Sequence, residues 1–188
     1  MKKILLILGH TRLNSFCWAL ADNYEKWVKE WCWIIKRINL IEEQFDTNLI
    51  TWINDKNIDD DVSSFQEDIL RADHLVFVYP TRWYNMPAIL KGFLDRTLLS
   101  WFAYKFNKTL LPQKLLKWRT AHIIVTADWP SIYYYLFGNP AIKVMKMTLW
   151  MCGIRVTRIT KIFWLRKLSK EKKQGRLTKL MKYWKKLI

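Results

Sequence analysis

This sequence of 188 residues has few cysteines, no pattern of metal-ligand spacing and no long apolar run. The three cysteines, at positions 17, 32 and 152, are widely separated, which argues against a disulfide framework and indicates a reducing, cytoplasmic compartment. The three histidines show no metal-ligand spacing with one another or with the cysteines, so we expect no metal site. No stretch approaches about 18 consecutive apolar residues, so no membrane-spanning helix is predicted. The opening MKKILLILGH lacks a small-residue cleavage site, which favours a first strand over a signal peptide.

Glycine is scarce and tryptophan is abundant. Average usage of about 7% glycine would give roughly 13 residues at this length, whereas the chain has 5 glycines and 12 tryptophans. Glycine supplies backbone conformations that a residue with a large side chain adopts poorly. The imbalance therefore predicts altered turns.

Acidic residues are nearly missing from the last part of the chain. The net charge is +16, and residues 155–188, with 13 Lys and Arg and one acid, carry +12 of it. A basic segment of this kind binds nucleic acid, membranes or acidic partners, or it is simply a solvated face. Nothing in the segment specifies nucleic acid, and we favour the solvated face while the other interpretations stay open.

Short apolar runs alternate with helical patterns along the chain, which predicts an α/β fold with parallel strands joined by crossover helices. Strands are expected at 2–9, 32–40, 73–80, 120–128 and 155–163, and helices at 14–31, 63–72, 86–99, 139–152 and about 169–187. Asn14 or Ser15 would cap the first helix, Ser63 or Ser64 would open the second, and Pro87 suits the first turn of the third. The last helix has apolar residues at helical spacing, which favours a helix that covers the sheet over one that lies on a membrane. We expect one domain, 1–188, built on an open, doubly wound sheet.

Such sheets bind ligands where the carboxyl ends of the strands meet. After the first strand, GHTRLNSFC offers hydroxyl, amide and backbone N–H groups at a helix start, which is a phosphate cradle or simply a set of capping groups. After the third strand, Pro80 ends the ladder and PTRWYNMP places Trp83 and Tyr84 in a loop, where two aromatic side chains can flank a planar ring. After the fourth strand comes TADWPSIYYY, with Thr126 and Asp128. The three loops predict a ligand slot with Trp83 and Tyr84 against the ring.

These segments resemble the flavodoxin-like NAD(P)H:quinone oxidoreductases, a family that includes quinone reductases and flavoprotein subunits of bacterial potassium-efflux systems. The matching stretches are GHTRLNSF, ADHLVFVYPTRWYNMPAILKGFLDR, FAYKF, AHIIVTAD and CGIRVTRIT, and they extend over nearly the whole chain. The resemblance implies a five-stranded sheet of order 2-1-3-4-5 with helices on both faces, and a homodimer. It also implies noncovalent FMN or FAD that passes a hydride from NAD(P)H to a quinone or similar acceptor.

The resemblance also assigns residues to the cofactor. Those expected at the phosphate and ribityl part are His10, Arg12, Ser15, Phe16 and Cys17; those expected along the isoalloxazine are Pro80, Thr81, Arg82, Trp83, Tyr84, Asn85 and Met86; those expected at the far edge of the ring are Thr126, Ala127 and Asp128. Tyr134 is the candidate to assist hydride transfer, although the histidine that often accompanies such a tyrosine has no counterpart in LFGNP.

Several residues depart from the family pattern. Arg82 stands where an aromatic residue is common, and a cation there would stabilise a reduced, anionic flavin. Trp101, Trp118 and Trp164 occupy places where the family usually has glycine, and Trp129 lies in a loop that often contains one. Overpacking typically costs about 1–3 kcal/mol per site, so these changes predict altered turns, and whether they leave flavin binding intact stays open.

Two function classes follow from these features. The first is a flavin-dependent NAD(P)H oxidoreductase. The second is a non-enzymatic or weakly active ancillary subunit that keeps the fold and contacts a membrane transporter or another anionic surface through its basic C-terminal region. An electron-carrier flavodoxin is disfavoured, because such carriers usually present an acidic face.

Overall fold

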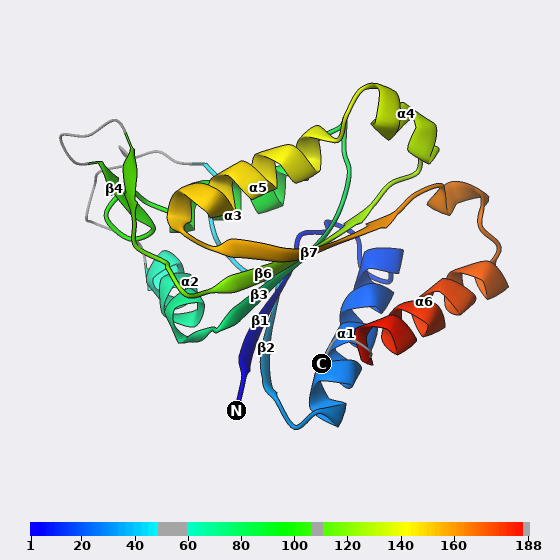
Figure 1. Cartoon of the computed structure of the whole chain (residues 1–188), viewed down its shortest axis with the longest axis horizontal. Helices are drawn as coiled ribbons and strands as arrows, with labels where there is room; N and C mark the ends of the chain where they lie inside the picture. Colours follow the sequence, from blue (N-terminus) through cyan, green and yellow to red (C-terminus); the bar gives the residue numbers. More distant parts are fainter. Residues whose placement is uncertain (49–59, 107–110, 186–188) are drawn as a thin grey trace.

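A computed structural model of the chain describes residues 1–48, 60–106 and 111–185. Its centre is a five-stranded parallel sheet of β1 (Lys3–Leu8), β2 (Ile34–Asn39), β3 (His74–Pro80), β6 (Thr120–Thr126) and β7 (Arg155–Ile162). The strand order is β2-β1-β3-β6-β7 (Figure 1). This is the predicted order, 2-1-3-4-5 among the strands of the sheet.

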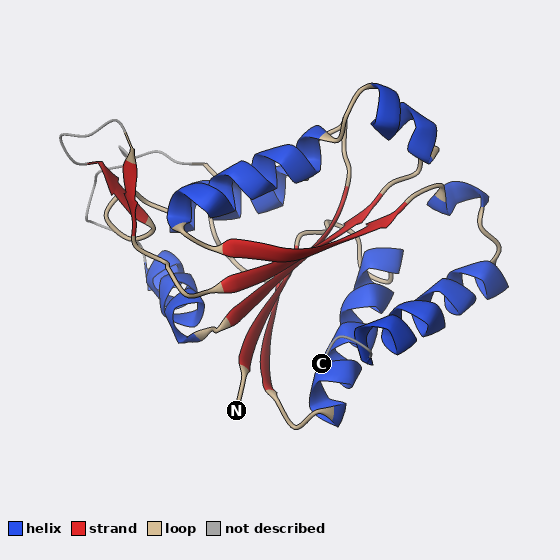
Figure 2. Ribbon diagram, in the orientation of Figure 1, coloured by secondary structure: helices blue, strands red, loops and turns tan. Residues whose placement is uncertain are grey.

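Helices cover both faces of the sheet (Figure 2). The helices α1 (Phe16–Glu30) and α6 (Lys170–Lys185) pack together on one face, and α2 (Asp60–Arg71), α3 (Ala88–Thr97) and α5 (Pro140–Cys152) lie on the other. The chain passes to the opposite face after β2, because the strand after β2 pairs with the other side of β1. A crevice for a ligand therefore forms at the carboxyl ends of β1 and β3.

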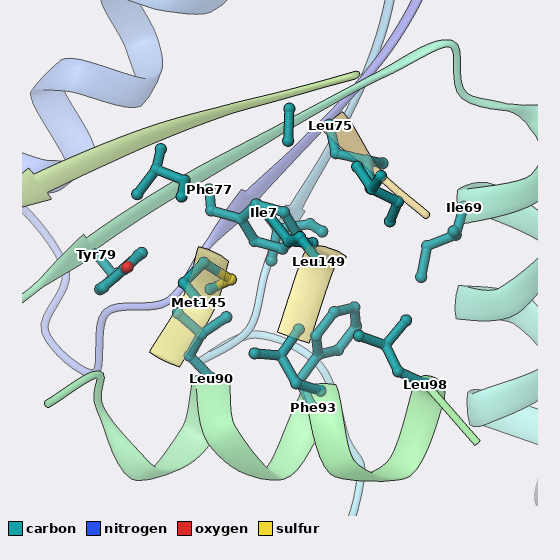
Figure 3. Packing of buried hydrophobic residues seen from close by; sticks show 14 of the residues in the cluster. Ile7, Ile69, Leu75, Phe77, Tyr79, Leu90, Phe93, Leu98, Met145 and Leu149 are labelled. Carbon is teal, nitrogen blue, oxygen red and sulfur yellow. The ribbon is translucent and has the colours of Figure 1, made fainter. Parts of the chain in front are cut away.

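The central strands are apolar on both faces because each face is covered by helices. In β1, Leu5 and Ile7 pack in the cluster under α3 and α5, whereas Leu6 and Leu8 pack against α1. Figure 3 shows the first cluster, in which Phe77, Phe93 and other side chains from the sheet and α3 interdigitate. Gly9 follows β1, and a Cβ there would lie 2.9 Å from the Cβ of Leu90, so glycine lets α3 approach the end of β1.

Most predicted elements are confirmed, with a few corrections. Ser15 caps α1, and its Oγ accepts from the N–H of Trp18 at 3.3 Å. The second helix begins at Asp60, so the prediction that Ser63 or Ser64 opens it is wrong; the first helical turn carries acidic side chains instead, which suit a helix N-terminus. Pro87 is the N-cap of α3, one position before the helix. Part of the connection expected at 41–61 lies outside the described residues.

The sequence patterns missed four short elements. The strands β4 (Tyr104–Phe106) and β5 (Pro112–Lys114) form a separate antiparallel pair, α4 (Ser131–Leu136) follows β6, and the 3₁₀ helix η1 (Leu165–Lys167) follows β7. Each has six residues or fewer, too few for a hydrophobic period to show. In the described parts of the chain, no helix is long and apolar enough to cross a membrane.

The outer strands of the sheet carry cations. On β7 the exposed side chains include Arg155 and Lys161, and on β2 Lys36 pairs with the buried carboxylate of Asp68 while Arg37 pairs with Asp22. The two edge strands are therefore partly polar, whereas β1 and β3 are buried along almost their whole length.

Candidate functional site

A cavity of about 800 Å³ lies at the carboxyl ends of β1, β3 and β6. It brings together the loop and helix start after β1, the loop after β3 and the loop after β6, and the fourth side is formed by η1 and the beginning of α6. Figure 1 shows α6 lying beside α1 at this end of the sheet. The cavity falls in the size range of small-molecule and cofactor sites.

The cavity wall includes most of the residues that the sequence assigned to a site. It is formed by His10, Arg12, Asn14, Ser15, Phe16, Cys17, Ala19, Pro80, Thr81, Arg82, Thr126, Ala127, Asp128, Leu165, Arg166, Lys170, Lys173, Gln174 and Leu177. Three loops that are distant in sequence thus meet because parallel strands end at one edge. Among these residues there is no tryptophan, so the additional indoles do not line the cavity.

The start of α1 is built as an anion site. Ser15 is an extended N-cap whose hydroxyl accepts from Trp18, and Asn14 just before it has φ 55°. The first N–H groups of the helix, from Phe16 and Cys17, have no helical carbonyl before them to accept their hydrogen bonds. Unpaired donors and the helix dipole together favour a negative group at this position.

The charges on the wall are strongly unbalanced. Its cations are Arg12, Arg82, Arg166, Lys170 and Lys173, and its one acid is Asp128. In the described part of the chain, none of these side chains forms an ion pair. A cavity with five unpaired cations against one carboxylate fits an anionic ligand such as a phosphate.

His10 stands at the base of this wall as a neutral ring. Its Nδ1 accepts a hydrogen bond from the backbone N–H of Arg12 at 2.9 Å. Burial lowers the pKa of His10, and the nearby guanidinium groups of Arg82 and Arg12 lower it further. A neutral ring that accepts at Nδ1 carries its proton on Nε2, which leaves that N–H as a donor.

Cys17 is inert in this setting. Burial raises the pKa of the Cys17 thiol to about 12. Its Sγ lies 3.1 Å from Oγ1 of Thr126, which joins the start of α1 to the end of β6. Since the thiolate is the reactive form of cysteine, Cys17 contributes shape and not nucleophilicity.

The loop after β3 is a tight turn. The backbone groups of Arg82 and Asn85 are hydrogen-bonded to each other in both directions, at 2.7 and 2.8 Å, and Trp83 and Tyr84 have φ of 47° and 63°. Two successive positive φ angles are the geometry of a type I′ turn. The turn presents Arg82 to the cavity and projects Trp83 away from the protein.

Four of the residues that the resemblance assigned to the isoalloxazine lie outside the cavity wall. Trp83 is 98% exposed, Met86 is buried in the core under α3, and the Asn85 side chain accepts from the N–H of Met86. Tyr84 packs instead against Tyr134, with 5.5 Å between ring centroids. The sequence predicted a slot lined by Trp83 and Tyr84. In the structure neither side chain lines the cavity, so this prediction is wrong.

Tyr134 belongs to a neighbouring cavity of about 450 Å³. Its ring stacks on Phe163 at 4.9 Å and 19°, and it is 8% exposed. Burial raises the pKa of its hydroxyl, and the charge of Asp128 acts in the same direction. Tyr134 is therefore a protonated hydroxyl beside the main cavity rather than on its wall.

Sequence reasoning missed the wall contributed by η1 and α6. Arg166, Lys170, Lys173 and Leu177 were seen as part of a basic or sheet-covering segment and not as site residues. The predicted topology held a signal for this wall. Because β7 is parallel to β1, it ends at the same edge of the sheet, so the chain that follows β7 must pass the same crevice before it turns back as a helix.

No metal site emerges among the described residues, which contain no group of three or more potential metal-ligating side chains.

Comparison with known proteins gives a consistent result. A protein-family model described as “Flavodoxin-like fold” matches residues 2–188. The chain is 36% identical over 106 residues to an uncharacterized NAD(P)H oxidoreductase of Haemophilus influenzae, an alignment that covers 54% of this chain and 52% of the relative. It is 30% identical over 99 residues to the glutathione-regulated potassium-efflux system ancillary protein KefF of Enterobacter, covering 50% of this chain and 53% of KefF.

Among solved structures, an FMN-dependent NADH-azoreductase of Bacillus anthracis in complex with FMN superposes with a TM-score of 0.75 at 20% identity, covering 100% of this chain and 99% of that one. This likeness shows the fold. The alignments to the two curated relatives span about half of those proteins.

Proposed function

Since this chain belongs to the flavodoxin-like fold family, we propose that it is a flavin-dependent NAD(P)H oxidoreductase that reduces a quinone or a similar acceptor. The observation that carries the proposal is the cationic cavity at the carboxyl ends of β1, β3 and β6, with a helix N-terminus on its wall. The names of an oxidoreductase relative and of an FMN-bound structural neighbour support the same activity.

The residues present fit a flavin in charge and in shape. Ser15, Phe16 and Cys17 at the start of α1 would hold the phosphate, with Arg12 as a counter-charge and the Nε2–H of His10 as a donor to the ribityl part. The five cations of the wall suffice for one phosphate or for two, so both FMN and FAD agree with the charge.

The ring of the flavin would lie between the loops after β3 and β6. The residues that would contact it are Pro80, Thr81, Arg82, Thr126, Ala127 and Asp128, with Tyr84 at its edge. For Met86 and Trp83 the side chains are turned away, so their contribution would be limited to the backbone of the turn. Asn85 would act by holding this turn.

A bound flavin would supply the hydride chemistry between NAD(P)H and the acceptor. The chain contributes position and electrostatics. Arg82, unpaired and on the wall, places positive charge where a reduced flavin would be negative. Tyr134 keeps its proton at neutral pH and offers it from beside the cavity.

Reconstitution tests the proposal. Purified protein, with flavin added if necessary, should show a visible flavin absorption band and should oxidise NADH or NADPH only when a quinone is present. Release and chromatography of the cofactor would distinguish FMN from FAD. A protein that stays colourless after flavin is added would refute the proposed function.

We also propose that the protein is a homodimer that contacts its second copy through α4. The apolar side chains at the end of α4 are highly exposed to solvent: Tyr135 is 85%, Leu136 66% and Phe137 70% exposed. Neighbouring exposed apolar side chains of this kind mark interaction surfaces.

A second candidate function is an ancillary subunit of a membrane transporter, which the likeness to KefF favours. Turnover of NAD(P)H with a quinone by the isolated protein, at a rate unaffected by a transporter, would reject it.

A further inference from the structure

The end of the molecule around α6 carries a dense group of cations. The basic face consists of Lys161 at the end of β7, Arg166 and Lys167 in η1, and Lys170, Lys172, Lys173, Arg176 and Lys179 in α6. None of these eight forms an ion pair with another described residue. Glu171 is the one acid between residues 155 and 188.

The basic face borders the cofactor cavity. Arg166, Lys170 and Lys173 are on the wall of that cavity, and Lys161, Arg176 and Lys179 line an adjacent hollow of about 400 Å³. Both groups come from the same stretch of chain, which runs from the end of β7 into α6. Whatever binds the basic face therefore lies against the mouth of the cavity.

The packing of α6 against its own domain favours a surface over a groove as the partner of the basic face. α6 lies along α1, with Leu177 buried and Leu180 partly buried between them (Figure 1). A helix that reads nucleic acid projects into a groove, whereas α6 is held against its own domain. A cluster of four to eight cations is what a surface of anionic lipid recognises.

We propose that the basic face docks the protein on an anionic phospholipid membrane, with the cavity mouth at the bilayer surface. The attraction is electrostatic, because the cations of the basic face are exposed or half-buried, whereas Leu177 of α6 is buried and Leu180 is partly buried against α1. This inference rests on the proposed function. If the cavity mouth lies at the bilayer surface, the acceptor is a lipophilic quinone that reaches the cavity from the bilayer.

Vesicle co-sedimentation of the full chain without flavin tests the docking. The probes are vesicles of phosphatidylcholine alone and of phosphatidylcholine with phosphatidylglycerol, at low and high salt. Binding should require phosphatidylglycerol and should weaken strongly with salt. A variant with Gln at Lys161, Lys167, Lys172 and Lys179, none of which lines the cofactor cavity, should lose at least about a hundredfold in partitioning.

A matched control removes the same charge elsewhere. Lys26, Lys105, Lys143 and Lys146 are exposed and outside the basic face, and their replacement by Gln should change partitioning by less than about tenfold. Equal losses in the two variants, no binding to protein-free vesicles, or tighter binding to duplex DNA than to vesicles at the same salt would each overturn the proposal. Flavin binding, measured separately, should be the same in both variants, so a failure of docking is distinguishable from a failure of the proposed function.

An independent observation concerns two of the three tryptophans with left-handed backbone; the third, Trp83, belongs to the tight turn after β3, which the Arg82–Asn85 hydrogen bonds hold. Trp118 has φ 74° and is 97% exposed, and Trp164 has φ 64° and is 44% exposed. A residue with a Cβ is strained in this region, and glycine is not. Because the Trp118 side chain is almost entirely in solvent, burial does not offset the strain.

We infer that positions 118 and 164 are glycine positions, and that the cell which makes this protein inserts glycine there. Codon UGA, read as tryptophan in some genetic codes and as glycine in others, would account for both residues and for 5 glycines beside 12 tryptophans. Trp101 and Trp129 do not have positive φ, so the backbone argument does not extend to them.

Peptide masses of the protein from its native source decide the question. Glycine at positions 118 and 164 is expected, and tryptophan at both would overturn the inference. Two variants of the chain with tryptophan at these positions test the backbone argument. The equilibrium constant for folding should be about fivefold larger for Trp118→Gly than for Trp118→Ala, because alanine keeps the Cβ. Equal stability of these two variants would show that the position does not require glycine.

Discussion

Ser15 links the stability of α1 to the cavity, because one hydroxyl serves both. It caps the helix through the N–H of Trp18 and stands on the cavity wall. Ser15→Ala should lower the free energy of unfolding by about 1 kcal/mol and should also weaken flavin binding. Urea denaturation and a fluorescence titration with flavin measure the two effects.

Ser169 provides the matched control. Its Oγ accepts from the N–H of Lys172 at 3.3 Å at the start of α6, and it is not on the cavity wall. Ser169→Ala should cost a similar stability and leave flavin binding unchanged. If both variants weakened flavin equally, Ser15 would have no role beyond capping.

Two glycines with positive φ differ in their surroundings, which gives a second prediction. Gly153 ends α5 with φ 92°, and a Cβ there would lie 2.9 Å from the Cβ of Lys114. Gly138 has φ 76° with nothing within 4 Å of such a Cβ. Gly138→Ala should cost about 1 kcal/mol of stability from the backbone alone.

Gly153→Ala should cost more, about 2–3 kcal/mol, because crowding against β5 adds to the strain. Thermal or urea denaturation of the two variants makes the comparison. A smaller loss at Gly153 than at Gly138 would contradict the packing argument.

Single residues also show how far the sequence could identify the site. Ser15, Thr126 and Asp128 were found because they lie in the segments at the carboxyl ends of apolar strands, and His10 was found through the family resemblance. The direction of a side chain within a tight turn was not readable: Trp83 projects outward because two positive φ angles reverse the chain there. The spacing of residue types in a sequence does not predict positive φ angles at residues other than glycine.

At the scale of elements, two histidines on neighbouring strands make stability depend on pH: His74 on β3 is half-buried and His122 on β6 is buried. His74 Nδ1 lies 2.7 Å from the Thr120 hydroxyl, and His122 Nε2 lies 2.8 Å from the Thr160 hydroxyl. Burial lowers the pKa of both rings, that of His74 to about 4, and the charges of Lys2 and Arg158 add to the lowering for His74.

The sign of the pH effect follows from these shifts. The unfolded chain binds protons at His74 below the ordinary histidine pKa of 6.5, whereas the folded chain does so only near pH 4. Stability should therefore fall as the pH decreases from about 6.5 to about 4, by about 3 kcal/mol for His74 alone. Urea midpoints across this range measure the fall.

His74→Gln tests the assignment, because glutamine keeps a hydrogen-bonding group but does not titrate. The variant should show a flatter dependence on pH, with His122 providing what remains. An unchanged profile would place the acid sensitivity elsewhere.

The long elements were predictable because apolar residues repeat along them, and the short ones were not. α4 and η1 have too few residues for a period, yet they determine where Tyr134 and Arg166 lie. α6 was recognised as a helix, but its apolar side was assigned to the sheet in general. The structure shows that it packs on α1 and closes the cavity, a contact that depends on the crossover after β7.

At the scale of the whole molecule, the exposed apolar side chains of α4 predict assembly. Analytical ultracentrifugation should show a dimer, and introducing lysine at Leu136 and Phe137 should give a monomer that stays folded, because both side chains are solvent-exposed in one copy. The matched control places lysine at Ile34 and Leu70, which are 49% and 52% exposed near the amino ends of the strands. Dissociation by both pairs, or by neither, would count against a dimer through α4.

The cations on the two outer strands have a consequence for how copies of the protein meet. An uncovered strand is a template on which another strand can add, and lysine or arginine along it makes that addition unfavourable through repulsion between like charges. With Arg155 and Lys161 exposed on β7, growth of a continuous sheet from molecule to molecule is opposed at that border, whereas Lys36 and Arg37 on β2 are paired with carboxylates. Raising the ionic strength removes that protection, so fibrous association should appear first in concentrated salt.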